Sequence, residues 1–177
     1  IDDWPVFNYA RFLLETDRLE KYLLLLYAHT NYHGLPETMC YYEQIGSEGR
    51  VYAPDCVPCA LITPLMVSWM VAFEPVRERA LYLLRGVPAQ WFARGFSARG
   101  MNTRWGKLNV CVEPTRDGLR IAADLPDWID EAVYLDLRGL TKAQLAVAQA
   151  CGYAATAMGE DGLRLTLTGQ RHVEIRI

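Results

Sequence analysis

The chain has 177 residues and a formal net charge of −3, so it is long enough to bury a substantial core as one domain or two small ones. This charge balance gives no electrostatic case for nucleic acid or for an anionic membrane surface as a partner. Hydrophobic residues make up 51% of the chain, which excludes a mainly disordered protein. We therefore expect a folded chain that binds small molecules, neutral polymers or protein, and neither nucleic acid nor a membrane.

The first part of the chain, residues 1–94, carries a helical pattern. Asp2-Asp3-Trp4-Pro5 is typical of a helix start, with an acidic N-cap and Pro in the first turn. Apolar residues then recur at spacings of three and four, with further apolar residues on the flanks. The recurring residues are Phe7, Ala10, Leu13, Leu14, Leu19, Leu23, Leu24 and Leu26. The pattern predicts a packed helix that is covered on most of its sides.

The segment CVPCALITPLMVSWMVAF, residues 56–73, contains no charged residue. Its length is at the lower edge of a membrane span, but acidic Asp55 and Glu74 bracket it and no Lys or Arg cluster flanks it. A helix buried in a multi-helix assembly is therefore favoured, with Pro64 expected to kink it or break its hydrogen-bond ladder. The next segment, residues 75–86, predicts another short amphipathic helix.

Beyond about residue 95 the apolar residues alternate, with a period of two. This pattern is present in residues 108–112, 119–125, 132–138, 163–168 and 172–177, and turn signals occur at residues 116–118 and at Glu160-Asp161-Gly162. Residues 142–157, KAQLAVAQACGYAATA, are ambiguous, because the alanines favour a helix whereas Cys151-Gly152 favours a hairpin; we expect strand. The predicted fold is α+β, with a helical segment over residues 1–94 and an antiparallel β-sandwich over residues 95–177.

Two short motifs lie at the junction of these halves. One is Leu-Leu-x-x-x-Pro-x-x-Trp over residues 83–91, and the other is the turn Thr-Arg-Trp-Gly at residues 103–106. They stand between the predicted buried helices and the predicted alternating sheet. This order of elements and motifs resembles the C-terminal part of polysaccharide-degrading enzymes built on an (α/α)6 toroid with an appended β-sandwich. The resemblance covers roughly residues 36–177 and implies that most of the barrel lies outside this chain. It also favours a secreted or periplasmic location, and the first residue, Ile1, leads us to expect a processed or excised piece.

The polar stretch over residues 27–49 holds the candidate catalytic residues. Glycoside cleavage needs two carboxyl groups that flank the scissile bond. Glu43 is the first candidate, because it lies between Tyr42 and Gln44 in a largely aromatic stretch and the resembling enzymes have Tyr-Glu-Gln there. Tyr rings beside a carboxyl group desolvate it and raise its pKa, as a general acid requires. Glu37 is the second candidate, with a helix cap or a solvated surface residue as its alternative.

Four further residues are candidates for contacts with sugar: His33, Tyr41, Tyr42 and Asp55. For Asp55 the alternative is the N-cap of the following helix. His29 and His33 are spaced i and i+4, as metal ligands can be, but no HExxH motif accompanies them. We therefore expect no metal and no cofactor.

The five cysteines are odd in number, so at least one thiol is unpaired. Cys56-Val57-Pro58-Cys59 at a predicted helix start is a spacing used in redox sites, where the helix lowers the pKa of a thiol. The strand and βαβ pattern of a thioredoxin-like motif are missing around it. Two thiols buried in the core are the plain alternative.

The sequence hypothesis is the C-terminal fragment of a glycoside hydrolase that cleaves a poly- or oligosaccharide by carboxylate acid/base catalysis. Its partners would be carbohydrate and the remainder of the enzyme polypeptide. Two alternatives stay open: a polysaccharide lyase on the same scaffold, and a non-catalytic module that binds glycan or protein.

Overall fold

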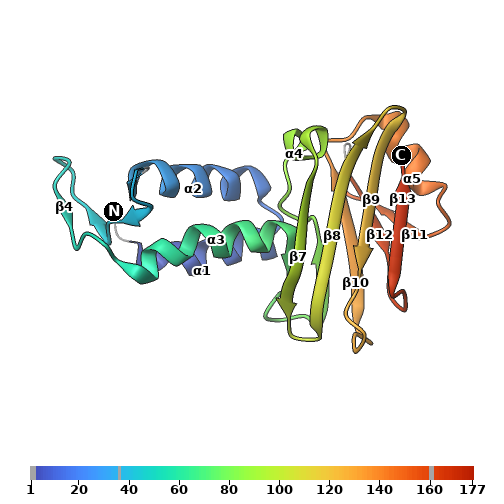
Figure 1. Ribbon diagram of the computed structural model, residues 1–177, viewed down its shortest axis with the longest axis horizontal. Helices are drawn as coiled ribbons and strands as arrows, with labels where there is room; N and C mark the ends of the chain where they lie inside the picture. Colours follow the sequence, from blue (N-terminus) through green and yellow to red (C-terminus); the bar gives the residue numbers. More distant parts are fainter. Residues whose placement is uncertain (1–2, 36, 160–161) are drawn as a thin grey trace. The chain divides into compact units, whose positions relative to one another are not determined.

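The computed structural model describes residues 3–35, 37–159 and 162–177. Its residues form two compact units, Ile1–Trp69 and Met70–Ile177, and we describe each by itself. Helices dominate the first unit and strands the second, as the colours of Figure 1 show along the chain. The α+β class predicted from the sequence is thus confirmed. The division falls at residues 69 and 70, whereas the change of period in the sequence placed it near residue 95.

The described residues of unit 1 form three helices and two short hairpins. The helices are α1 (Trp4–Glu15), α2 (Leu19–Tyr32) and α3 (Val57–Val71), whose last two residues belong to unit 2. The hairpins pair β1 (Gly34–Leu35) with β2 (Cys40–Tyr41) and β3 (Gln44–Ile45) with β4 (Val51–Tyr52), both antiparallel. In Figure 1 the β4 hairpin extends beyond the start of α1.

The helix start at Trp4 was predicted correctly. The prediction of a single long helix was wrong, because the chain forms α1 and α2 instead. The chain turns between α1 and α2 at Asp17, whose φ is 60°, and the Arg18 N–H donates to the Leu13 carbonyl at 2.8 Å. This reversal lets α2 pack beside α1. The gain is burial of apolar surface, because Leu13 and Tyr22 become almost wholly inaccessible.

The prediction that this part of the chain is covered on most of its sides was also wrong for the residues that the structure describes. One face of each helix is buried, and large apolar side chains on the other faces are exposed. The exposed ones are Trp4, Tyr9 and Phe12 on α1 and Leu24, Tyr27 and Tyr32 on α2.

The apolar segment after Cys56 forms a helix, as predicted. Pro64 lies inside α3, and the helix runs without interruption from Val57 to Val71. The Tyr22 hydroxyl donates to the Met66 carbonyl at 2.7 Å, within the turn after Pro64. Within the described ranges, no helix combines the length and the hydropathy that a membrane crossing would require.

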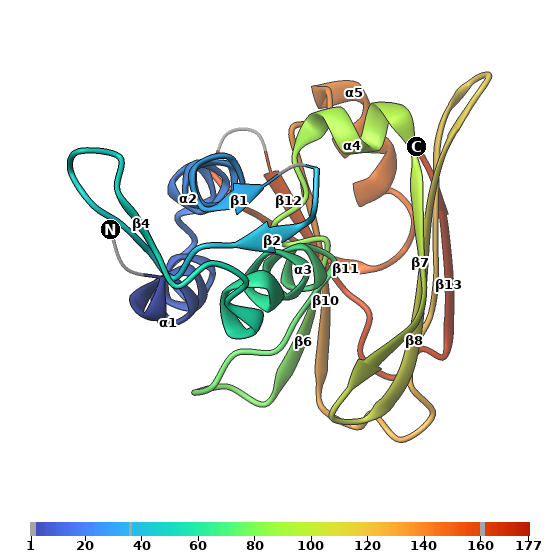
Figure 2. The same cartoon turned by 60° about the vertical axis from the view of Figure 1, so that its left-hand side comes forward.

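In unit 2 the described strands form two sheets, which Figure 2 separates, with α4 and α5 together at one end. The five-stranded sheet has the order β11-β12-β10-β6-β5 and the four-stranded sheet the order β13-β9-β8-β7. The strands are β5 (Ala72–Phe73), β6 (Ala80–Leu83), β7 (Phe96–Thr103), β8 (Gly106–Thr115), β9 (Gly118–Asp124), β10 (Ala132–Arg138), β11 (Ala154–Ala157), β12 (Gly162–Thr166) and β13 (His172–Arg176). The helices are α4 (Ala89–Arg94) and α5 (Lys142–Gln149).

All five strands predicted by alternation are present, and alternate residues in them are buried. In the four-stranded sheet the buried set includes Leu108, Val110, Val112, Ile121, Val173 and Ile175, and in the five-stranded sheet Val133, Leu135, Leu137, Leu163 and Leu165. The predicted turn at residues 116–118 joins β8 to β9. Glu160 and Asp161 of the second turn signal lie outside the described residues.

Two local predictions in this unit were wrong. Residues 80–83 form strand β6 instead of a helix and pair in parallel with β10, with Ala80 opposite Ala132, so this sheet is mixed. Residues 142–149 form helix α5 instead of a strand, whereas residues 154–157 of the same segment form strand β11, as expected. The Thr141 hydroxyl accepts the Gln144 N–H, and the Gln144 side chain accepts the Thr141 N–H, which is a capping box.

A buried ion cluster links the strands of the five-stranded sheet. The Asp136 carboxylate is inaccessible and accepts hydrogen bonds from Arg164 at 2.6 and 2.8 Å and from Arg85 at 3.2 Å. The guanidinium groups of both arginines also lie over the Tyr82 ring. Because each charge has an opposite partner, the cluster is compatible with burial.

Candidate functional site

The candidate site lies where α1 begins, α2 ends and α3 begins, under the two hairpins of unit 1. Backbone hydrogen bonds fix the segment between the hairpins to its surroundings. The Asp3 N–H donates to the Glu43 carbonyl at 3.1 Å, and the Glu43 N–H donates to the Ala53 carbonyl at 3.2 Å. The Tyr42 N–H donates to the His33 carbonyl at 3.0 Å. The loop is thus held from three directions at Tyr42 and Glu43.

A buried carboxylate lies between His29 in the last turn of α2 and His33, the residue that caps the end of this helix. Asp3 Oδ2 is 2.9 Å from His29 Nε2, and Asp3 Oδ1 is 3.0 Å from His33 Nδ1. The three side chains are at most 3% exposed. His33 Nδ1 is also 3.0 Å from the Tyr42 carbonyl and is aligned with it, so the described residues supply Asp3 Oδ1 with no aligned hydrogen-bond donor.

The His29 ring is fixed on its other side by a hydroxyl network. Its Nδ1 lies 3.2 Å from Thr63 Oγ1 on α3, and the Tyr41 hydroxyl donates to the same oxygen at 3.0 Å. The ring stacks on Tyr41 with 5.1 Å between centroids and on His33 with 5.4 Å. The cluster therefore joins α2, α3 and strand β2 through polar contacts that are buried or partly buried.

Glu43 lies above this cluster and pairs with an aromatic residue. The Trp4 indole Nε1–H donates to Glu43 Oε1. Glu43 is half-buried, whereas Trp4 is 61% exposed. An indole N–H only donates, so it fixes one carboxylate oxygen as an acceptor and sets the orientation of the other. The result is an oriented carboxyl group beside an accessible aromatic ring.

The structure brings some of the predicted site residues together and separates others. Glu43 and Tyr42 are neighbours between β2 and β3, and the Tyr42 N–H bonds to the His33 carbonyl; His33 and Tyr41 are both buried. Glu37 lies in the exposed turn between β1 and β2. Asp55 is exposed as well.

Neither Asp55 nor Glu37 occupies the helix-cap position that was the alternative to a site role. Asp55 is separated from α3 by Cys56, whose carbonyl accepts the Ala60 N–H at 3.0 Å. Cys56 therefore stands at the position that a capping residue occupies, and Asp55 does not. Glu37 lies in the turn between two short strands, and neither α2 nor α3 begins after it.

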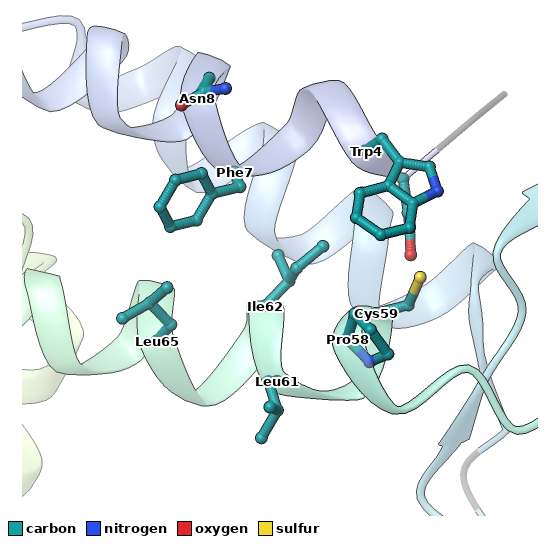
Figure 3. A pocket seen from close by; sticks show the side chains of 9 residues that line it. Trp4, Phe7, Asn8, Pro58, Cys59, Leu61, Ile62 and Leu65 are labelled. Carbon is teal, nitrogen blue, oxygen red and sulfur yellow. The ribbon is translucent and has the colours of Figure 1, made fainter.

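An apolar groove of about 280 Å³ opens beside the cluster, between α1 and α3. Figure 3 shows Trp4 and Phe7 on one wall and Ile62 and Leu65 on the other, with the sulfur of Cys59 directed toward the start of α1. Asp3 also lines the groove. One end of an apolar groove is therefore polar, which is the usual composition of a small-molecule site.

Asp3 is the residue that sequence reasoning missed. Its position before Trp4 predicted an N-cap, but its side chain makes no capping hydrogen bond and binds the histidines instead. The i, i+4 spacing of His29 and His33 was the available signal, because it placed both rings on one helix face. No pattern in the neighbouring sequence indicated that Asp3, which lies 26 positions before His29, would contact these rings.

Unit 2 carries a separate polar groove of about 400 Å³ on its four-stranded sheet. Arg99, Asn109, Arg120, Asp124 and His172 contribute to its lining. The His172 ring contacts the Asp124 carboxylate at 2.7 Å, and this hydrogen bond lowers the pKa of Asp124. Across the described ranges, no three His, Cys, Asp or Glu side chains are grouped so that they could hold a metal ion.

Comparison of the chain with protein-family models, with curated proteins and with solved structures finds no match.

Proposed function

We propose that the chain is the C-terminal part of a carbohydrate-active enzyme of the glycoside hydrolase type. In this proposal α1, α2 and α3 are the last helices of an (α/α)6 toroid, and the two sheets of unit 2 form the appended β-sandwich. The buried alternate residues of both sheets support the second point, because such residues form the core between the layers of a sandwich. The exposed apolar side chains of α1 and α2 support the first, because neighbouring barrel helices would cover them.

The observation that carries the proposal is the hydrogen bond from the Trp4 indole to Glu43. It places an oriented carboxyl group beside an aromatic ring that is open to solvent, which is the combination that a pyranose needs for acid/base chemistry and for packing of its apolar face. Tyr52, half exposed on β4, supplies a further aromatic surface on the neighbouring hairpin. The second carboxyl group that hydrolysis requires would come from Glu37 or from the remainder of the enzyme.

Glu43 would act as the acid/base residue or hold a sugar hydroxyl group. The buried Asp3–His29–His33 cluster would serve as the rigid support behind it, because the Glu43 and Tyr42 backbone groups bond to Asp3 and His33. In this arrangement His33 and Tyr41 position the loop and do not contact the sugar. Their burial also disfavours a lyase in which these two residues would remove a proton.

A second candidate is a non-catalytic glycan-binding module, and one observation favours it. The groove on the four-stranded sheet presents amide, carboxylate, imidazole and guanidinium groups on a rigid surface. Groups of this kind hydrogen-bond sugar hydroxyls without chemistry. The two candidates differ in the residues that they require.

The test uses Glu43→Gln, which keeps the shape of the side chain and removes its acid/base capacity. In the complete protein we expect hydrolysis of a glycan substrate to fall by about 100-fold or more. Glu48→Gln is the matched control, because Glu48 lies in the same region and pairs only loosely with Arg50, 3.5 Å away at an exposed position. Unchanged turnover in Glu43→Gln would remove the catalytic role. Glycan binding abolished instead by Asn109→Ala would favour the second candidate.

A further inference from the structure

Cys56 and Cys59 place two free thiols in contact at the start of α3. Their Sγ atoms are 2.8 Å apart, and neither cysteine is in a disulfide. A disulfide bond has an S–S length of roughly 2.0 Å, so the two atoms need to approach by only about 0.8 Å to form one. The Cys-x-x-Cys spacing across the first turn of a helix brings this pair together before any reaction.

The two thiols differ in accessibility. Cys56 is half-buried, whereas Cys59 is 2% exposed. Cys56 directly precedes α3, so its side chain lies at the end of the helix and part of it is open to solvent. Cys56 is therefore the thiol that an external reagent meets first, and Cys59 is the one held behind it.

The surroundings of Cys59 suit the second step of a thiol exchange. Burial raises the pKa of the Cys59 thiol, and the neighbouring Cys56 thiol and Asp3 carboxylate raise it further. Cys59 thus keeps its proton until it reacts. The Asp3 carboxylate, whose charge and hydrogen bond help to raise the pKa of the Cys59 thiol, is the nearby base that can accept that proton.

We propose that Cys56 and Cys59 form a reversible disulfide site that exchanges with external disulfides of the glutathione type. The Cys56 thiolate attacks one sulfur of the external disulfide, which forms a mixed disulfide and releases one thiolate. Cys59 then gives its proton to Asp3 and attacks the Cys56 sulfur, which forms the Cys56–Cys59 disulfide and releases the second thiolate. The protein dithiol is oxidised by two electrons, and the external disulfide is reduced to two thiols. This proposal does not depend on the carbohydrate function.

The test incubates the native 177-residue chain with mixtures of oxidised and reduced glutathione, followed by acid quench, alkylation and peptide mass mapping. We expect the peptide that contains residues 56–59 to lose two hydrogens, to carry no glutathione and to regain both thiols in reduced glutathione. The equilibrium constant for closure should be at least ~10-fold larger in the native chain than in the urea-unfolded chain, because folding holds the sulfurs together. Equal constants, or two thiols that remain alkylated throughout, would overturn the proposal.

Three variants separate the roles of the thiols. Cys59→Ser should retain one glutathione on Cys56, because the resolving thiol is gone, and Cys56→Ser should react with glutathione at least ~10-fold more slowly at Cys59, which is buried. Cys151→Ser is the control, because Cys151 is exposed and lies in unit 2. It should leave closure of the 56–59 disulfide unchanged. Glutathione that accumulates on Cys59 in the wild-type chain would contradict the assignment.

Discussion

The Asp3 carboxylate lies 2.9 Å from His29 Nε2 and is completely inaccessible to solvent. This contact joins the residue before α1 to the last turn of α2, and through Thr63 the same ring is joined to α3. A side chain that the sequence assigns to a helix cap therefore connects the three helices of unit 1. The loop that carries Glu43 depends on the same place, because the Asp3 N–H binds the Glu43 carbonyl.

Removal of the Asp3 carboxylate should destabilise unit 1. In Asp3→Ala both histidines lose their carboxylate partner in a buried place, and the loss of one member of such a cluster costs about 3 kcal/mol. We expect a lower urea midpoint for the helical signal in far-ultraviolet circular dichroism. Asp55→Asn is the control, because Asp55 is exposed and Asn tolerates its φ of 62°, so its effect should stay within about 0.5 kcal/mol. Equal midpoints for the two variants would contradict a structural role of Asp3.

Trp4→Phe should separate the aromatic surface at the site from its hydrogen bond. The variant keeps an apolar ring but loses the indole N–H that orients Glu43. For an oligosaccharide that binds the wild-type chain, we expect Kd to rise about fivefold, which corresponds to one lost hydrogen bond of about 1 kcal/mol. Isothermal titration calorimetry measures this, with Phe12→Leu, an exposed position on the same helix, as the control. If Trp4→Phe binds as tightly as the wild type, the indole does not position Glu43 for sugar.

Gly118→Ala should destabilise unit 2 more than an ordinary glycine substitution. A Cβ atom at residue 118 would lie 2.2 Å from the Ile177 carbonyl oxygen, which accepts the Leu119 N–H at 2.6 Å. The substitution therefore has to displace the end of the chain from β9, at an expected cost of about 3 kcal/mol.

Gly169→Ala is the matched control for this substitution. Gly169 also has a positive φ, 84°, but a Cβ atom there meets nothing within 4 Å. Only the backbone strain remains, so we expect a loss of about 1 kcal/mol. Urea unfolding of both variants gives the comparison, and a loss in Gly118→Ala no larger than in Gly169→Ala would show that the chain end moves aside at little cost.

Acid should weaken unit 2 through a row of charges on its four-stranded sheet. Hydrogen bonds from Arg120 and Arg176 lower the pKa of Glu174 to about 2, and Arg120 also lowers the pKa of Glu113. Because these values lie below the ordinary ~4.3 of a glutamate, the ionised groups stabilise the folded state above about pH 4. That contribution is lost as the pH falls toward about 2.

Arg120→Gln should change both the pKa of Glu174 and the loss of stability in acid. The pKa of Glu174, followed by carboxyl carbon NMR, should rise toward its ordinary value, and Tm should fall less steeply between pH 4 and pH 2 than in the wild type. Lys107→Gln, which removes an exposed cation of the same sheet that bonds to Asn102, should leave the pKa of Glu174 unchanged. A Glu174 pKa that stays low without Arg120 would assign the effect to Arg176 alone.

Local sequence patterns predicted the strands of unit 2 well and its short elements poorly. Alternation over residues 108–112 and 119–125 identifies β8 and β9, because a strand with one buried face imposes a period of two. Strand β6 carries no such period. All four of its residues are buried and its partner β10 lies about fifty residues later, so its environment was not visible in the local pattern. Helix α5, in contrast, had a local signal in its capping box from Thr141 to Gln144, which the strand interpretation overlooked.

For the candidate site, the sequence identified residues but not their environments. Glu43, Tyr42 and His33 were named and lie close together, yet His33 proves to be buried while Glu37 stays at the surface. The partner of Glu43 was not predicted, because Trp4 lies 39 positions earlier in the chain.

The sequence by itself determined where the chain forms helices and strands wherever the period of apolar residues was clear, and where α1 begins. Only the tertiary structure decided that Asp3 binds two histidines and that Trp4 orients Glu43. The physical reason is that periodicity and capping depend on neighbours within a few residues, whereas the contacts of a buried polar group depend on chain segments that meet only after folding. The Cys56–Cys59 pair combines both, because its spacing is local and its buried neighbour Asp3 is not.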